Sequence, residues 1–154
     1  MSPAAPHPKI ARMLAHWRSL APAPGMLPGR QHFDPIRVPD LLPHTWLIDV
    51  ERGPVLRFRY RLIGTALIEA GVPMRRGDYF DEVANQPSRD EVAGMLAGVV
   101  LERRPNWRRG VPLVAHVKHV TELERVVLPL AADGATVDML IGATLFYWED
   151  GRVY

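Results

Sequence analysis

The sequence contains no cysteine, and lysine is almost absent, since Lys9 and Lys118 are the only lysines among nineteen basic residues. The absence of cysteine excludes disulfide scaffolds, thiolate metal sites, iron–sulfur clusters and cysteine nucleophiles. No apolar run approaches the ~20 residues that a membrane-spanning helix needs. The first residues also lack the charged-then-apolar order of a secretory signal. We therefore expect a cytoplasmic protein that does not enter a membrane.

The 154 residues have the composition of a single globular domain, with 47% hydrophobic and 23% charged residues. The isoelectric point is about 9.3 although the net charge is only +2, because arginine stays protonated to very high pH. So small an excess of positive charge does not favour nucleic-acid binding.

The N-terminal part is expected to contain a flexible tail over residues 1–8 and an amphipathic helix over residues 9–21. The helix carries one apolar stripe at helical spacing, formed by Ile10, Met13, Leu14, Trp17 and Leu20. Two interpretations remain open, because such a stripe packs either on its own domain or against a partner.

The remaining chain predicts an α+β fold in which strands come first and last, with helices between them. Residues 57–63 alternate cleanly, so Phe58, Tyr60 and Leu62 are expected on one face and Arg57, Arg59 and Arg61 on the other. We expect strands over 45–50, 57–63, 107–119, 125–131 and 137–148, and helices over 65–70 and 88–103.

Three stretches resemble a known bacterial family. They are DPIRVPDLLPHTWLIDVERG (34–53), FRYRLIGTALIEAGVPMRRGDYFDEV (58–83) and ERVVLPLAADGATVDMLIGA (124–143). Together they are similar to the single-domain PAS family called PAS_5. The resemblance implies a PAS-like domain over 30–150, built on a five-stranded antiparallel sheet with strand order 2-1-5-4-3. It also implies a sensory or interaction module, since some PAS domains hold a small ligand between the sheet and the long helix.

The resemblance and the alternation pattern together give candidate site residues. A ligand pocket between the sheet and the helix 88–103 is expected to involve Phe58, Tyr60, Leu62, Val92, Leu96, Leu128 and, at its rim, His119. A partner surface is expected to involve Met13, Trp17, Leu20, Arg57, Arg59, Arg61 and Trp107, because arginine and tryptophan are enriched at binding hot spots. A charged edge strand that resists mispairing is the alternative for the three arginines of residues 57–61.

The cofactor of such a module is not identified by the sequence. Flavin-adduct and cinnamoyl chromophores of PAS photosensors need a cysteine, and haem-binding PAS domains usually take a histidine from the long helix, where residues 86–104 contain none. His116 and His119 point to opposite faces if they lie on one strand, so they do not form a metal site. Haem, a flavin adduct and thiolate metal sites are therefore disfavoured.

We expect a non-enzymatic sensor or adaptor that forms a homodimer through its N-terminal helix and signals to an unidentified protein partner. The sequence ends shortly after the last predicted strand, so the signal is expected to pass by protein contact. One alternative is a small α+β enzyme with a cone-shaped fold, which would pair His119 with Glu122 or Asp138. The other is a ligand-free structural interaction module.

Overall fold

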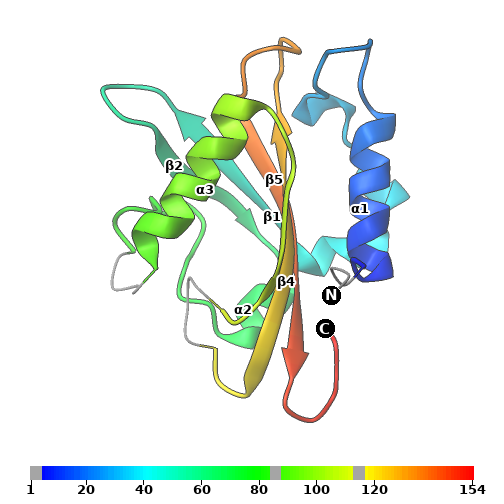
Figure 1. Cartoon of the computed structure of the whole chain (residues 1–154), viewed down its shortest axis with the longest axis vertical. Helices are drawn as coiled ribbons and strands as arrows, with labels where there is room; N and C mark the ends of the chain where they lie inside the picture. The colour runs from blue at the N-terminus through cyan, green and yellow to red at the C-terminus, as the bar shows by residue number, and fades with distance from the viewer. Residues whose placement is uncertain (1–4, 84–87, 113–116) are drawn as a thin grey trace.

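The computed structural model describes residues 5–83, 88–112 and 117–154 (Figure 1). Two longer helices and five strands form its framework, and short 3-10 segments connect α1 to β1. The elements are α1 (Pro8–Ser19), 3-10 segments at Arg30–His32, Pro35–Arg37 and Pro39–His44, β1 (Thr45–Glu51), β2 (Arg57–Ile63), α2 (Thr65–Ala70), α3 (Arg89–Glu102), β3 (Asn106–Gly110), β4 (Val120–Leu130) and β5 (Met139–Trp148). No helix among these residues is long and apolar enough to cross a membrane.

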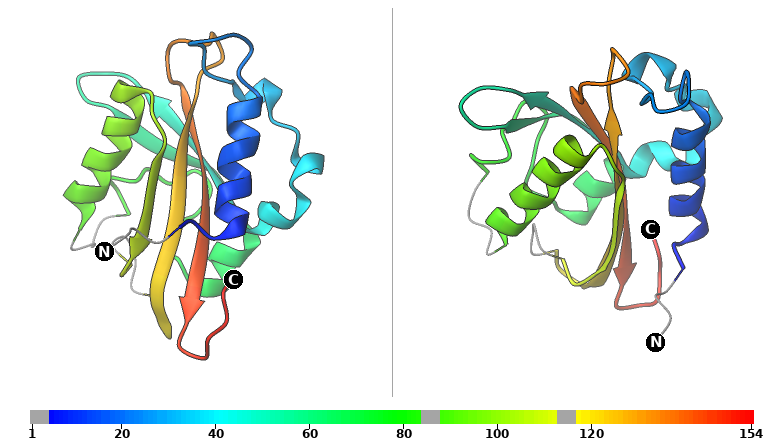
Figure 2. Two further views of the ribbon diagram at one scale, coloured as in Figure 1. Left: turned by 45° about the vertical axis from the view of Figure 1, so that its right-hand side comes forward. Right: turned by 45° about the horizontal axis from the view of Figure 1, so that its top comes forward.

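The five strands form one sheet in the order β2-β1-β5-β4-β3, and every neighbouring pair is antiparallel. This order confirms the predicted PAS-like topology. Helices cover both faces of the sheet, with α3 on one face and α1 on the other (Figure 2). Both inner layers are apolar, so most of β5 and residues 126–130 of β4 are buried on both sides.

Helix α1 packs on its own sheet. The imidazole of His7 accepts a hydrogen bond from the backbone N–H of Lys9 at the start of the helix, and Pro8 occupies the first turn, where proline is favoured. Met13 and Trp17 are buried, and the indole Nε1 of Trp17 donates to the carbonyl oxygen of Pro129 at 2.9 Å. Leu20 packs against the same core. Met13, Trp17 and Leu20 therefore do not form a free partner surface, which corrects the prediction for these three residues.

The alternation predicted for β2 is interrupted by a β-bulge. Ile48 of β1 lies opposite Tyr60, whereas the preceding Leu47 lies opposite Leu62, so β2 has one extra residue at this point. A bulge shifts the following side chains to the opposite face. Leu62 therefore lies on the face away from Tyr60 and is 42% exposed. The prediction that Leu62 faces the pocket is wrong for this reason.

The strand predicted over 107–119 is shorter, since β3 ends at Gly110. Residues 113–116, which include His116, lie outside the described residues. His119 is in a turn with a positive φ of 65°, and β4 begins directly after it at Val120. The side chain of His119 is 62% exposed and its Nδ1 lies 3.0 Å from a carboxylate oxygen of Glu149.

Candidate functional site

A cavity of about 90 Å³ lies between α3 and the sheet. Val92, Met95 and Leu96 enter it from α3, where Met95 and Leu96 follow Val92 by three and four residues and so lie on the same side of the helix. The opposite wall comes from the sheet. The full lining of this inner cavity is Trp46, Ile48, Tyr60, Leu67, Val72, Met74, Val92, Met95, Leu96, Arg108, Val117, Leu123, Arg125, Thr144 and Phe146.

A second, more polar space adjoins the inner cavity, with which it shares Val92, Met95, Arg108 and Arg125. We call it the outer vestibule. Its volume is about 300 Å³, and Glu91, Asn106 and Trp107 complete its lining. Arg108 and Arg125 line both spaces, so two positively charged residues lie where the apolar inner cavity meets the more polar vestibule.

The two arginines have few partners. Arg125 donates to Oδ1 of Asn106 at 2.9 Å, and Arg108 donates to the carbonyl oxygen of Val111 at 2.8 Å. Within the described part of the chain, neither forms an ion pair with an acid. Burial, assisted by the neighbouring charge of Arg108, lowers the pKa of Arg125 to about 10, so it keeps its charge at neutral pH. The site thus presents a positive charge that no carboxylate of the described chain neutralises.

Three of the predicted pocket residues line the inner cavity: Tyr60, Val92 and Leu96. Phe58 is buried but lies outside its lining. Leu128 is fully buried on the opposite face of the sheet. It lies an odd number of residues after Leu123 and Arg125, which face α3, and side chains along a strand point to alternate faces. His119 does not contribute, since it lies in an exposed turn beside Glu149.

Trp46, Arg108, Arg125 and Phe146 were not among the predicted pocket residues. Arginine in a strand usually faces solvent. The sequence pattern of residues 124–130 therefore favoured Val126 and Leu128, rather than Arg125, as the residues that face the cavity. The missed signal is that Leu123 and Val127 share the face of Arg125. An arginine flanked by apolar residues of the same parity indicates a half-buried position.

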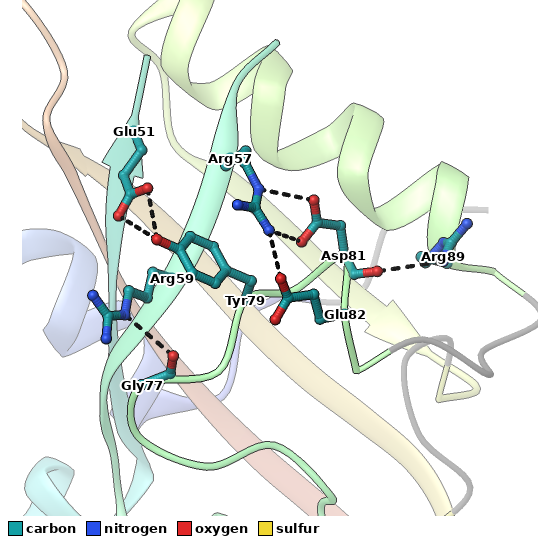
Figure 3. A network of polar contacts seen from close by, with 8 residues as sticks. All are labelled: Glu51, Arg57, Arg59, Gly77, Tyr79, Asp81, Glu82 and Arg89. Atoms are coloured by element: carbon teal, nitrogen blue, oxygen red, sulfur yellow. Dashed lines mark hydrogen bonds and ion pairs between the residues drawn. The ribbon is translucent and has the colours of Figure 1, made fainter. Parts of the chain in front are cut away.

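The arginines of β2 are engaged within the chain, and Figure 3 shows the contacts of Arg57 and Arg59. Arg57 forms a two-pronged contact with Asp81 and also pairs with Glu82, and its guanidinium lies 3.8 Å from the centre of the Tyr79 ring. The hydrogen bonds to Asp81 and Glu82 raise the pKa of Arg57. The hydrogen bond from Arg57 lowers the pKa of Asp81. Residues 77–80 also run along β2 and bond to its backbone. The segment therefore covers this edge.

The other two arginines of β2 are also occupied. Arg59 donates to the carbonyl oxygen of Gly77 at 3.1 Å, and Arg61 contacts both carboxylate oxygens of Asp49 at 3.0 Å. A free arginine stripe for an acidic partner, as predicted for residues 57–61, is therefore not present. The physical reason is that carboxylates and a backbone carbonyl of the same chain lie within hydrogen-bonding distance of these guanidinium groups.

Trp107 has an internal role as well. Its indole Nε1 donates to Oε2 of Glu124 at 2.8 Å, and Glu124 is fully buried beneath the start of α1. The proposed enzyme pairs are not assembled either, because His119 contacts Glu149 rather than Glu122 or Asp138. Among the described residues, no cluster of three or more His, Asp or Glu side chains is arranged to hold a metal ion.

Gly142 on β5 determines the position of one cavity wall. A Cβ atom at this position would collide with the indole ring of Trp46, whose Nε1 donates to Oγ1 of Thr144 at 3.0 Å. We expect Gly142→Ala to destabilise the domain by about 1–3 kcal/mol, the usual cost of overpacking. Urea unfolding measures this change.

Gly94→Ala on α3 is the matched control, since a Cβ there meets nothing within 4 Å. It should stabilise the domain by about 0.5–1 kcal/mol, because alanine is the better helix former. Equal effects of the two alanines would show that the contact with Trp46 is unimportant.

The strand order β2-β1-β5-β4-β3, with α2 and α3 between the second and third strands, defines a PAS-like domain. The chain matches the family model of PAS_5, a PAS domain, over residues 5–145. It therefore belongs to the PAS_5 family, as the sequence resemblance predicted. No curated protein and no solved structure matches the chain.

Proposed function

We propose that this PAS domain is a non-enzymatic sensor that captures a small molecule between α3 and the sheet and passes the signal to another protein. The observation that carries the proposal is the inner cavity, whose apolar wall is interrupted by the half-buried guanidinium of Arg125. Ligand sites are typically apolar clefts with a few placed polar groups, and this site has that character.

Helix α3 is well placed to report occupancy. It contributes Val92 and Leu96 to the cavity, and the residue after it, Arg103, donates to the carbonyl oxygens of Gly25 and Gly134, both at 3.2 Å. A ligand that binds better to one position of α3 would shift the population toward that position. The loops at Gly25 and Gly134 would then move with the helix. We propose that a second copy or a signalling protein recognises this end of the molecule.

The size of the cavity favours one competing function, an interaction module that works without a ligand. Pockets for drug-sized ligands usually occupy about 300–1,000 Å³, whereas the inner cavity has about 90 Å³. The two functions differ in whether the purified protein contains a bound molecule.

Native mass spectrometry of the freshly purified protein tests this difference. We expect a mass above that of the bare chain, and we expect Val92→Phe to lose the extra mass because the larger ring fills the cavity. Val92→Phe should keep or raise the melting temperature, since filling a cavity is stabilising. Leu101→Phe, on the exposed face of the same helix, is the control and should retain the extra mass. A bare-chain mass for the native protein would favour the ligand-free module.

A further inference from the structure

Arg108 and Arg125 are directly opposite each other across β3 and β4. Like charges in this relation destabilise a strand pair. Here the repulsion acts beside an apolar cavity, where water screens it less than at the surface. The outer vestibule contains one acid, Glu91, and among the described residues it forms no ion pair with either arginine. The fold therefore maintains an unneutralised pair of positive charges at the mouth of the cavity.

Tyr60 adds a third polar group to the inner cavity. Its ring is buried, and its hydroxyl has no hydrogen-bond partner within the part of the chain that the structure describes. Burial raises the pKa of Tyr60 above its usual value, so the hydroxyl remains a neutral donor. Two cations and one free donor thus surround a space whose remaining lining is almost wholly apolar.

We infer that the cavity binds a small carboxylate, with its short apolar chain inside and its carboxylate group between Arg125 and Arg108. This inference rests on the proposed function and specifies its ligand. Guanidinium groups bind carboxylates in a planar, bidentate manner, and the charge of the ligand would remove the repulsion between the arginines. A purely inorganic anion would leave the apolar cavity unfilled.

The volume limits the length of the chain. An apolar cavity of about 150 Å³ holds one benzene ring of six carbons, whereas the inner cavity has about 90 Å³. An apolar chain of about three carbons therefore fits, which makes butyrate a suitable probe. Affinity should rise about fourfold per methylene from acetate to butyrate, which corresponds to the free energy of burying one methylene. Octanoate should gain no further affinity from its additional length.

Titration of the 15N-labelled full chain with butyrate tests the inference. The indole N–H resonance of Trp46, assigned with Trp46→Phe, reports binding because Trp46 lines the cavity. We expect Arg125→Gln to weaken butyrate binding at least tenfold, as removal of a charged hydrogen-bond donor usually does. Arg37→Gln removes the same charge from an exposed position outside the cavity lining and should change the affinity less than twofold.

A stability measurement separates binding from a structural role. Arg125→Gln removes like-charge repulsion, so its melting temperature should equal or exceed that of the native protein. A lower melting temperature together with unchanged butyrate affinity would assign Arg125 a structural role and overturn the inference. Arg108→Gln provides a second variant with the same expected pattern.

Neutral and cationic analogues distinguish this inference from the wider proposal. Butanol that binds as tightly as butyrate, with no effect of Arg125→Gln, would overturn the anion site but support small-molecule binding in the cavity. Inorganic phosphate that binds as tightly as butyrate would overturn the role of the apolar chain. If butyrate, butanol, butylammonium and phosphate all fail to bind, the inference is wrong, and the mass measurement decides the proposed function separately.

Discussion

Replacing Trp17 with alanine is expected to destabilise the domain by about 3–5 kcal/mol, the usual cost of removing a buried tryptophan. Its indole fills the space between α1 and the sheet and satisfies the carbonyl of Pro129. Trp17→Phe separates the two contributions, because it keeps most of the apolar contact and loses only the hydrogen bond. It should cost about 1–2 kcal/mol. Urea unfolding followed by circular dichroism measures both values.

Arg18→Ala, on the exposed side of the same helix, is the control and should change the stability by no more than about 0.5 kcal/mol. Removal of residues 1–21 should unfold the domain, because it uncovers Val126 and Leu128 on the second face of the sheet. If Trp17→Ala instead keeps native stability and changes only the oligomeric state, the alternative of a dimerising helix is correct and the packing argument fails.

The local elements of this fold could be predicted because their signals are local. The strand 57–63 alternates over its first residues, and Gly71, with a φ of 95°, ends α2 in the left-handed conformation that glycine favours. The strand order came from the family resemblance, because pairing between distant strands leaves no signal in one sequence. Ser88, the first residue of the predicted helix 88–103, is the N-cap residue of α3, and its side chain makes no capping hydrogen bond.

The sequence did not show which face of the sheet lines the cavity. For this reason some of the predicted site residues lie outside the cavity. In a sheet covered on one side, the alternation of apolar and polar residues shows which face is the inner one. Helices cover both faces here, so residues 126–130 of β4 are apolar and buried on both faces. Leu128 was therefore assigned to the pocket, although it lies on the opposite face of the sheet. The bulge beside Leu62 could not be predicted from the sequence either, because one extra residue in a strand changes the register without a distinctive sequence pattern here.

Replacing Glu124 with methionine is the second change with a large expected effect. The carboxylate of Glu124 is fully buried and accepts three hydrogen bonds, from the backbone N–H of His7 at 2.9 Å, from Trp107 Nε1 at 2.8 Å and from the Tyr147 hydroxyl at 2.6 Å. Burial, together with the bond to Glu124, raises the pKa of Tyr147 to about 12, so its hydroxyl remains a donor at neutral pH. Methionine has similar length but accepts none of these bonds effectively.

The bond to His7 has a consequence for α1. In a capping box, a glutamate three residues into the helix accepts from the backbone N–H of the N-cap residue. Here Glu124 does the same from a strand 117 residues away along the chain. Its negative charge also lies at the positive end of the helix dipole. Glu124 thus joins β3, β5 and α1 at one buried point, and we expect its loss to loosen the first turn of α1.

The expected loss of stability for Glu124→Met is about 3 kcal/mol, at about 1 kcal/mol for each donor left without a partner. An unsatisfied buried donor costs about 1–3 kcal/mol. We use the low end of this range because Trp107 and Tyr147 are only partly buried, so water replaces some of the lost hydrogen bonds. Glu124→Gln should cost less, since its carbonyl oxygen still accepts and the Tyr147 hydroxyl can accept from its amide. Faster hydrogen exchange of the amides of α1 in Glu124→Met would show that the helix start is the part released.

Glu122→Met is the matched control on the same strand, because Glu122 is 43% exposed and pairs with Arg109 at 3.4 Å. A surface ion pair contributes at most about 1 kcal/mol, so this variant should remain close to native stability and leave hydrogen exchange of α1 unchanged. If the two methionine variants behave alike, burial of the carboxylate contributes nothing special. A difference of several-fold in their effects would identify Glu124 as the group that fixes the first turn of α1 to the sheet, in addition to the apolar contacts of Met13 and Trp17.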